Sequence, residues 1–99
     1  MRRDDVLNEL RALQAELARL GVAHLFLYGS VARDEATLES DVDLLVEPTD
    51  RRFSVFDLVT VRDRLREALA APVDVHDFGG FRRLATFRAR IEPDLIRVF

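Results

Sequence analysis

Two aspartates separated by a single residue are the part of the sequence whose chemistry is easiest to state. Asp41 and Asp43 lie in residues 41–46 (DVDLLV), where the apolar residues predict a strand. Residues two apart on a strand project from the same face, so the two carboxylates would lie side by side and repel each other. A divalent cation removes that repulsion, and Mg²⁺ prefers a few carboxylates together with substrate phosphates. The alternative is a solvated strand end, since Asp-x-Asp pairs are common.

A glycine–serine pair upstream makes the aspartates more informative. Residues 24–28 (HLFLY) predict a buried strand that ends at Gly29, and a short helix is expected over residues 30–36, with Ser30 at or near its N-cap. Glycine lets a ligand approach the backbone, and the free N–H groups of a helix start suit phosphate oxygens. The other interpretation is an ordinary turn and cap. Strand, glycine–serine turn and aspartate pair together indicate a site for a metal-bound phosphate ligand.

The elements that must position these residues can be outlined from periodicity and helix-capping signals. Apolar residues spaced three and four apart predict a first helix that ends at Gly21, and Ser54 is expected to cap a helix that runs to Leu69. The remaining expected elements are a strand at 73–76, a turn at Gly79-Gly80, a helix at 81–91 and a short strand at 95–99. The predicted fold is a small α/β (α+β) domain, residues 1–99, with helices packed on a mixed sheet of three or four strands.

Composition narrows the function classes. The chain is 48% apolar with seven phenylalanines, so disorder is not expected, and its net charge of −3 argues against a dedicated nucleic-acid binder. The absence of cysteine excludes disulfides and thiolate metal sites. No run approaches ~20 apolar residues and residues 1–5 are charged, so the expected setting is cytoplasmic, with no membrane contact.

The polar residues outside the motif allow two interpretations each. Five arginines occupy the C-terminal fifth, where they form either a solvated face or a contact with a nucleotide or an acidic partner: Arg82, Arg83, Arg88, Arg90 and Arg97. His24 and His76 are expected to be structural, because no metal-ligand spacing joins them.

The motif residues resemble the nucleotidyltransferase superfamily, specifically its minimal (MNT) branch. The pattern reads GSVARDEATLESDVDLLVE over residues 29–47, and the surrounding elements extend the resemblance over nearly the whole chain. One position departs from the family pattern, because Asp34 stands where a glycine often follows the arginine. This departure changes the loop after the short helix and removes no metal ligand.

The resemblance implies roles for individual residues. Asp41 and Asp43 would hold two Mg²⁺ ions, Gly29 and Ser30 would hold the phosphates of ATP, and Arg33 would neutralise phosphate charge, although an ion pair with a nearby carboxylate is equally open. The superfamily also implies a third carboxylate on the next strand. Asp74 matches that position and is expected to act as a base or metal ligand, with Asp77 as its rival.

The implied reaction is transfer of AMP from ATP to an acceptor. MNT proteins act as antitoxins that modify a tyrosine of a HEPN ribonuclease toxin, so the resemblance implies a protein adenylyltransferase with a HEPN-type partner, in a hetero-oligomer and without direct nucleic-acid contact. Two alternatives stay open. One is a binding antitoxin that occludes the toxin without catalysis, and the other is a stand-alone small-molecule nucleotidyltransferase.

Overall fold

A four-stranded mixed sheet forms the centre of the computed structural model, which describes all 99 residues. The strands are β1 (Val22–Tyr28), β2 (Val42–Pro48), β3 (Val73–Asp77) and β4 (Ile96–Arg97), in the spatial order β3-β2-β1-β4. β1 pairs antiparallel with both β2 and β4, whereas β2 and β3 run parallel. The mixed sheet with packed helices expected from the sequence is confirmed, and β3 lies at an edge.

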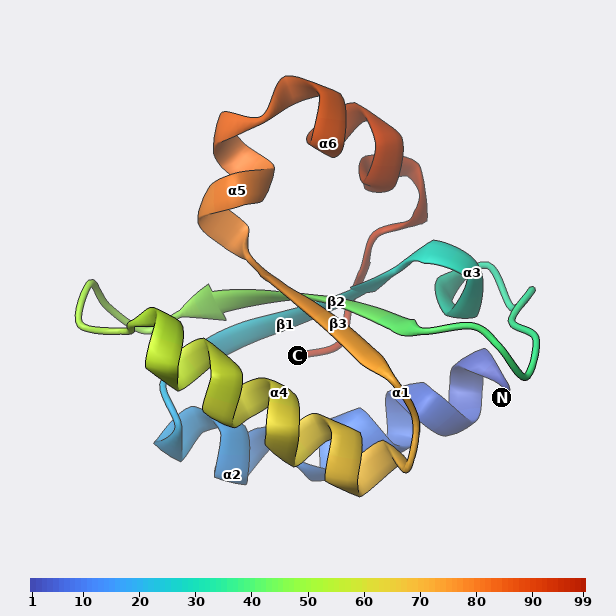
Figure 1. Cartoon of the computed structure of the whole chain (residues 1–99), viewed down its shortest axis with the longest axis horizontal. Coiled ribbons are helices and arrows are strands. Elements are labelled where there is room, and N and C mark those ends of the chain that lie inside the picture. Colours follow the sequence, from blue (N-terminus) through green and yellow to red (C-terminus); the bar gives the residue numbers. More distant parts are fainter.

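Helices cover the two faces of this sheet unequally (Figure 1). One face carries α1 (Arg3–Ala12), α2 (Gln14–Arg19) and α4 (Val55–Leu69), and the other carries α5 (Phe78–Arg83) and α6 (Ala85–Ile91). A short helix, α3 (Gly29–Ala32), follows β1 directly, and a 3-10 turn, η1 (Glu92–Asp94), leads into β4. None of the helices is long and apolar enough to cross a bilayer.

Alternation along the strands divides the core into two parts. On β2, Val42, Leu44 and Val46 belong to a cluster of 16 buried residues beneath α1, α2 and α4. The intervening Leu45 belongs to a second cluster of four, together with residues of β1, α5 and α6. Because strand side chains point alternately to opposite faces, the large cluster fixes which residues of β2 face α5 and α6.

Helix α4 begins with a capping box and ends at a residue in a strained backbone conformation. Ser54 and Asp57 form a reciprocal capping box at its start, as the sequence predicts for Ser54. At its other end Ala70 is the C-cap and adopts a left-handed conformation with φ of 50°. That conformation is natural for glycine and costs an alanine free energy through its Cβ.

Two helices predicted as continuous are broken, and the predicted glycine turn is wrong. The first helix is interrupted at Leu13, whose N–H bonds the carbonyl of Leu10 three residues back. Gly79 and Gly80 lie inside α5, because the Asp77 carboxylate caps that helix by accepting from the Gly79 N–H at 2.5 Å. The chain breaks instead at residue 84, where the backbone is extended between α5 and α6.

The boundaries near the motif also differ from the prediction. β2 begins at Val42, so Asp41 immediately precedes the strand, and α3 spans four residues in place of the expected seven. The helix ends there because Asp34 takes a left-handed φ of 59°. This position is the one at which the family pattern often has glycine, and a short polar side chain tolerates that conformation better than most. The Asp34 carboxylate also accepts a hydrogen bond from the Arg3 N–H at 3.0 Å.

Replacing Ala70 with glycine should stabilise the protein. The substitution removes the Cβ penalty at a left-handed C-cap, and we expect a gain of about 0.5–1 kcal/mol in the free energy of unfolding, measured by urea denaturation. Ala68→Gly in the last turn of α4 is the matched control and should destabilise by up to ~1 kcal/mol. A loss of stability in Ala70→Gly would contradict the strain assigned to this cap.

Candidate active site

Three neighbouring strands place three polar side chains in one row. Tyr28 of β1 pairs in register with Asp43 of β2, and Asp43 pairs in register with Asp74 of β3. Side chains at directly paired positions point to the same face of a sheet. The row therefore lies on the α5 and α6 face, because Val42 and Val73, which adjoin the two aspartates, are buried in the cluster on the other face. The alternation that the sequence predicts for both aspartates is confirmed.

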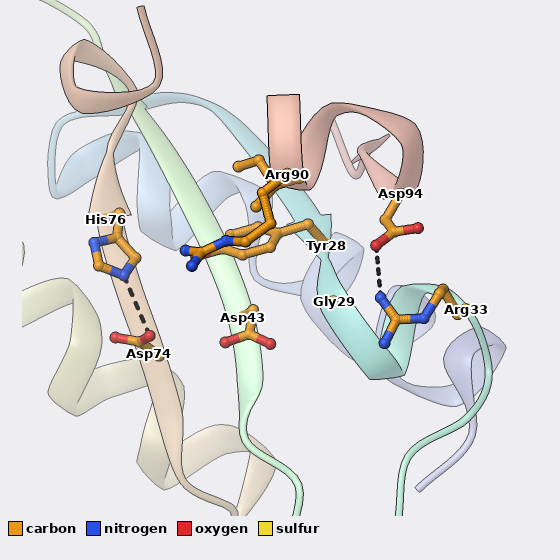
Figure 2. Close-up of a pocket in the computed structure, with 9 residues that line it drawn as sticks. Tyr28, Gly29, Arg33, Asp43, Asp74, His76, Arg90 and Asp94 are labelled. Atoms are coloured by element: carbon orange, nitrogen blue, oxygen red, sulfur yellow. Dashed lines mark hydrogen bonds and ion pairs between the residues drawn. The ribbon is translucent and has the colours of Figure 1, made fainter. Parts of the chain in front are cut away.

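This row forms the floor of a hollow of about 250 Å³, which we call the acidic hollow (Figure 2). The hollow opens between the sheet, α3, and the segment formed by α6 and η1. Its nine lining residues are Tyr28, Gly29, Arg33, Asp43, Asp74, His76, Arg90, Ile91 and Asp94. The polar ones come from four separate stretches of the chain, which only the tertiary structure brings together.

Electrostatic repulsion is concentrated on Asp43. Its pKa is raised above the usual value, first by burial and then by the negative charges of Asp74 and Asp41, while His76 and Arg33 act in the opposite direction. Burial together with the charges of Asp43 and Asp74 also raises the pKa of Tyr28, so its phenol stays neutral. A divalent cation would relieve the repulsion among these carboxylates, and Asp43 and Asp74 supply the oxygen ligands that Mg²⁺ prefers.

Asp41 lies apart from this pair. It is exposed just before β2 and does not line the acidic hollow. Its charge still acts on Asp43, as the pKa of Asp43 shows. No three acidic or histidine side chains in the structure are close enough together to hold a metal ion. Asp41 would therefore have to turn toward Asp43 to share a cation with the strand pair.

Gly29 allows the backbone of β1 to turn directly against the Asp43 carboxylate. Its φ is +79°, in the left-handed region that favours glycine, and a Cβ built there would lie 3.1 Å from Asp43 Cγ and closer still to Asp43 Oδ2. The glycine is therefore required on two counts, conformation and space. Ser30 follows as the second residue of α3, without a side-chain cap, and does not line the acidic hollow.

Arg33 reaches the hollow but is already paired. It lies at the end of α3, and its guanidinium donates to Asp94 at 2.6 Å (Figure 2). It also donates to Glu35 at 3.2 Å. Arg90, from α6, also lines the hollow and forms no ion pair in this structure. Its guanidinium instead stacks over Phe87, 5.5 Å from the ring centre.

The structure separates the two rival carboxylates on β3. Asp74 points into the acidic hollow, where its Oδ2 lies 3.2 Å from His76 Nε2. Asp77 caps α5 and is not among the residues that line this hollow. His76 lies on the same face as Asp74 because it is two residues further along the strand.

The two histidines lie in different settings. His24 is in a structural setting, with its ring nitrogen 3.3 Å from the Phe99 carbonyl, but His76 is exposed in the hollow. The spacing of two from Asp74 was the available signal for His76. Arg90 was indicated only as one of five C-terminal arginines, and Asp94 carried no signal, because both reach the site through the packing of α6 and η1.

Comparisons with known proteins show the family of the chain. A family model described as "Nucleotidyltransferase domain" matches residues 6–98. The chain is 35% identical over 79 residues to a Methanocaldococcus jannaschii protein named as a candidate protein adenylyltransferase, and the match covers 79% of this chain and 84% of that protein.

Two solved structures extend the comparison. A candidate minimal nucleotidyltransferase superposes with a TM-score of 0.80 at 27% identity, covering 97% of this chain and 95% of the other. A chain from the complex of a tri-AMPylated Shewanella oneidensis HEPN toxin with an MNT antitoxin superposes with a TM-score of 0.59 at 16% identity, covering 98% and 71%, which shows a shared fold.

Gly29→Ala should destabilise the protein by about 1–3 kcal/mol, since it combines backbone strain with a close contact to Asp43. The contact can be separated from the strain by adding the substitution to an Asp43→Ala background, where the carboxylate is absent. We expect the cost of Gly29→Ala, measured by urea denaturation, to fall in that background. Equal costs in the two backgrounds would mean that the contact with Asp43 contributes nothing.

Asp43→Asn should raise the melting temperature of the nucleotide-free protein at neutral pH. A carboxyl whose pKa is raised by folding favours the folded state when protonated, and that contribution is lost as the pH rises through the pKa of the folded protein. The advantage of the variant should therefore be larger near pH 7 than near pH 4, where the wild-type carboxyl is also largely neutral. Thermal melts followed by circular dichroism test this, with exposed Asp63→Asn as control. A destabilised Asp43→Asn protein at pH 7 would contradict the repulsion.

Proposed function

The chain belongs to the nucleotidyltransferase family, and from this premise we propose that it transfers AMP from Mg²⁺-bound ATP to a tyrosine hydroxyl of a HEPN-type partner and so acts as its antitoxin. The observation that carries the proposal is the in-register pair Asp43 and Asp74 beside the Gly29 turn. The name of the M. jannaschii relative and the AMPylated toxin in the S. oneidensis complex support the choice of a protein acceptor.

The carboxylates of the hollow suit a metal-bound triphosphate. Asp43 and Asp74 would hold Mg²⁺, with Asp41 turning in from the start of β2. When bound, the metal supplies charge neutralisation for the phosphates and the carboxylates together. Gly29 leaves the turn open to phosphate oxygens, and Ser30 lies in the first turn of α3, where backbone N–H groups have no acceptor within the helix.

The acidic hollow has two arginines, of which Arg33 is ion-paired and Arg90 is not. Arg33 would meet phosphate by exchanging its bond to Asp94, because both carboxylate and phosphate accept the same guanidinium donors. Arg90 needs no such exchange. Both positive charges border the floor on which negative charge would accumulate during transfer.

The proposed reaction balances at one phosphorus atom. The acceptor oxygen forms a bond to the α-phosphorus, the bond from that phosphorus to the α–β bridging oxygen breaks, and pyrophosphate leaves. The proton of the acceptor hydroxyl passes to a base, a role that we assign to Asp74 because it lies at the outer end of the carboxylate row and touches His76.

The acceptor hydroxyl must come from another molecule. Tyr28 is the only tyrosine of the chain, and its side chain is only 6% exposed. Its raised pKa keeps the phenol protonated beside two carboxylates. Tyr28 therefore forms part of the floor, and transfer to a partner is more consistent with this site than modification of the chain itself.

A binding antitoxin without catalysis would have no need for this arrangement. Burial and then the neighbouring carboxylates raise the pKa of Asp43, so its ionised form would cost folding free energy that a bound cation would offset. A protein that only occludes its partner would retain that cost without benefit, and this reasoning favours catalysis over the occlusion alternative.

Label transfer from ATP carrying a radioactive α-phosphate tests the proposal. The assay contains Mg²⁺ and the HEPN-type product of the neighbouring gene. Asp43→Asn and Asp74→Asn should each lower the transfer rate at least ~100-fold, equivalent to roughly 2.7 kcal/mol of activation free energy. Asp63→Asn, on the opposite face of the sheet, should transfer at the wild-type rate.

Two outcomes would count against the proposed function. If Asp43→Asn transferred AMP at the wild-type rate, the carboxylate row would have no part in the mechanism. Full neutralisation of an unlabelled partner by that variant would support occlusion.

A further inference from the structure

A second hollow adjoins the acidic hollow on its β3 side, and we propose that it binds the acceptor: an acidic segment of the partner protein that presents a hydroxyl-bearing aromatic side chain. We call it the side hollow. This inference rests on the proposed function, because it assigns the acceptor to the same reaction. It adds a binding surface and the chemical class of the segment that fits it.

The side hollow has a volume of about 290 Å³ and adjoins the acidic hollow, because His76 and Arg90 line both. His76 lies 3.2 Å from Asp74, so only these two shared side chains stand between the side hollow and the carboxylate row. The remaining walls of the side hollow come from the end of β3 and from α5 and α6.

Direction of attack places the acceptor on this side. In an in-line displacement the attacking and leaving oxygens lie on opposite sides of the phosphorus. The proposed site for the departing phosphates is the Gly29 turn, at the β1 end of the row, while Asp74 lies at the β3 end (Figure 2). The acceptor oxygen should therefore enter past Asp74 and His76, where the side hollow opens.

The lining suits an aromatic side chain. Leu84 is 57% exposed at the break between α5 and α6, and Phe87 presents its ring at the wall shared with Arg90. Gly80 adds open space, since no atom lies within 4 Å of a Cβ built on it. Leu84 and Phe87 are the two hydrophobic residues of the lining, so an aromatic ring would pack against them while its hydroxyl meets the polar side chains of the same lining.

The rim carries positive charge that is not neutralised within the chain. Arg83 and Arg90 line the side hollow and form no ion pair. The one carboxylate in the lining belongs to Asp77, which already accepts a hydrogen bond from the Gly79 N–H, so two unpaired arginines stand against one carboxylate that caps α5. This local excess is complementary to carboxylates that flank the acceptor side chain.

A nucleic acid fits this surface less well. Two unpaired arginines beside the carboxylate of Asp77 are a small positive excess compared with the basic patches of nucleic-acid binders, in a chain whose net charge is −3. An acidic peptide needs only a few carboxylates, placed on the rim away from the row.

The proposal is tested with the full-length chain by substitutions that reverse a charge on the rim or fill the side hollow. The probes are random copolymers of glutamate with tyrosine and of lysine with tyrosine, each carrying a fluorophore. Binding is measured by fluorescence anisotropy without nucleotide, and transfer is measured with labelled Mg-ATP. The wild type should bind and label the glutamate–tyrosine copolymer at least about tenfold better than the lysine–tyrosine copolymer.

Two variants should reduce this preference by different means. Arg83→Glu replaces an attraction with a repulsion and should weaken binding of the acidic copolymer at least about fivefold. Gly80→Leu should occupy the open space and weaken binding of the acidic copolymer similarly, while a leucine within α5 favours the helix. Arg66→Glu, on α4 across the sheet, makes the same change of net charge and should leave binding unchanged. Mg-ATP affinity, measured by calorimetry, should be unchanged in all three variants.

The outcomes separate this inference from the proposed function. If Asp43→Asn abolishes transfer but Arg83→Glu and Gly80→Leu leave the copolymer preference unchanged, the role proposed for the side hollow is wrong and the proposed function is supported. If these variants weaken copolymer binding but the wild type transfers no AMP, the binding surface is supported and the proposed function is wrong.

Weakened Mg-ATP binding in Gly80→Leu would assign the side hollow to the nucleoside. Displacement of the acidic copolymer by a single-stranded RNA oligonucleotide at equal charge would assign the rim to nucleic acid, and either result overturns the proposal.

Discussion

The in-register pairing of Asp43 with Asp74 is the constraint on which the rest of the site depends. Parallel pairing of β2 with β3 sets the two carboxylates side by side, and antiparallel pairing with β1 brings Tyr28 into the same row. A shift of one residue in either register would turn an aspartate toward the buried cluster and a valine toward the hollow. The 16-residue cluster resists that shift, because it would have to accept a carboxylate.

The row of Tyr28, Asp43 and Asp74 lowers the stability of the fold, although our proposed function requires its carboxylates. The pKa of Asp43 is raised first by burial and then by the charges of Asp74 and Asp41, so its ionised form is disfavoured in the folded protein. Gly29 adds a left-handed turn that only glycine can make against the carboxylate. The 16-residue cluster on the other face of the sheet stabilises the fold and offsets the free-energy cost of the strained turn and the buried carboxylate.

Helices α5 and α6 give the site its charge contrast. They bury few side chains on the sheet, mainly around Phe81 and Ile91, yet they bring unpaired arginines to the edge of an acidic floor. The result is a row of carboxylates suited to a cation, bordered on one side by cations suited to anions. In our proposals this contrast orders the substrates, with the phosphates near Gly29 and an acidic acceptor beyond His76.

The sequence by itself determined the strands, their buried faces and the motif, because these follow from local periodicity. Alternation around Asp43 and Asp74, and the cap at Ser54, are settled by neighbouring residues in the chain. The tertiary structure decided what distant segments contribute. It paired Arg33 with Asp94, 61 residues further along the chain, and placed Arg90 in the hollow. Local interactions also overrode the apolar period of the last helix, because Asp77 caps α5 and the extended backbone at residue 84 separates α5 from α6. Long-range packing leaves no periodic signal in the chain, so the faces of Asp43 and Asp74 were predictable, whereas the place of Asp41 outside the hollow and the arginines around the row were not.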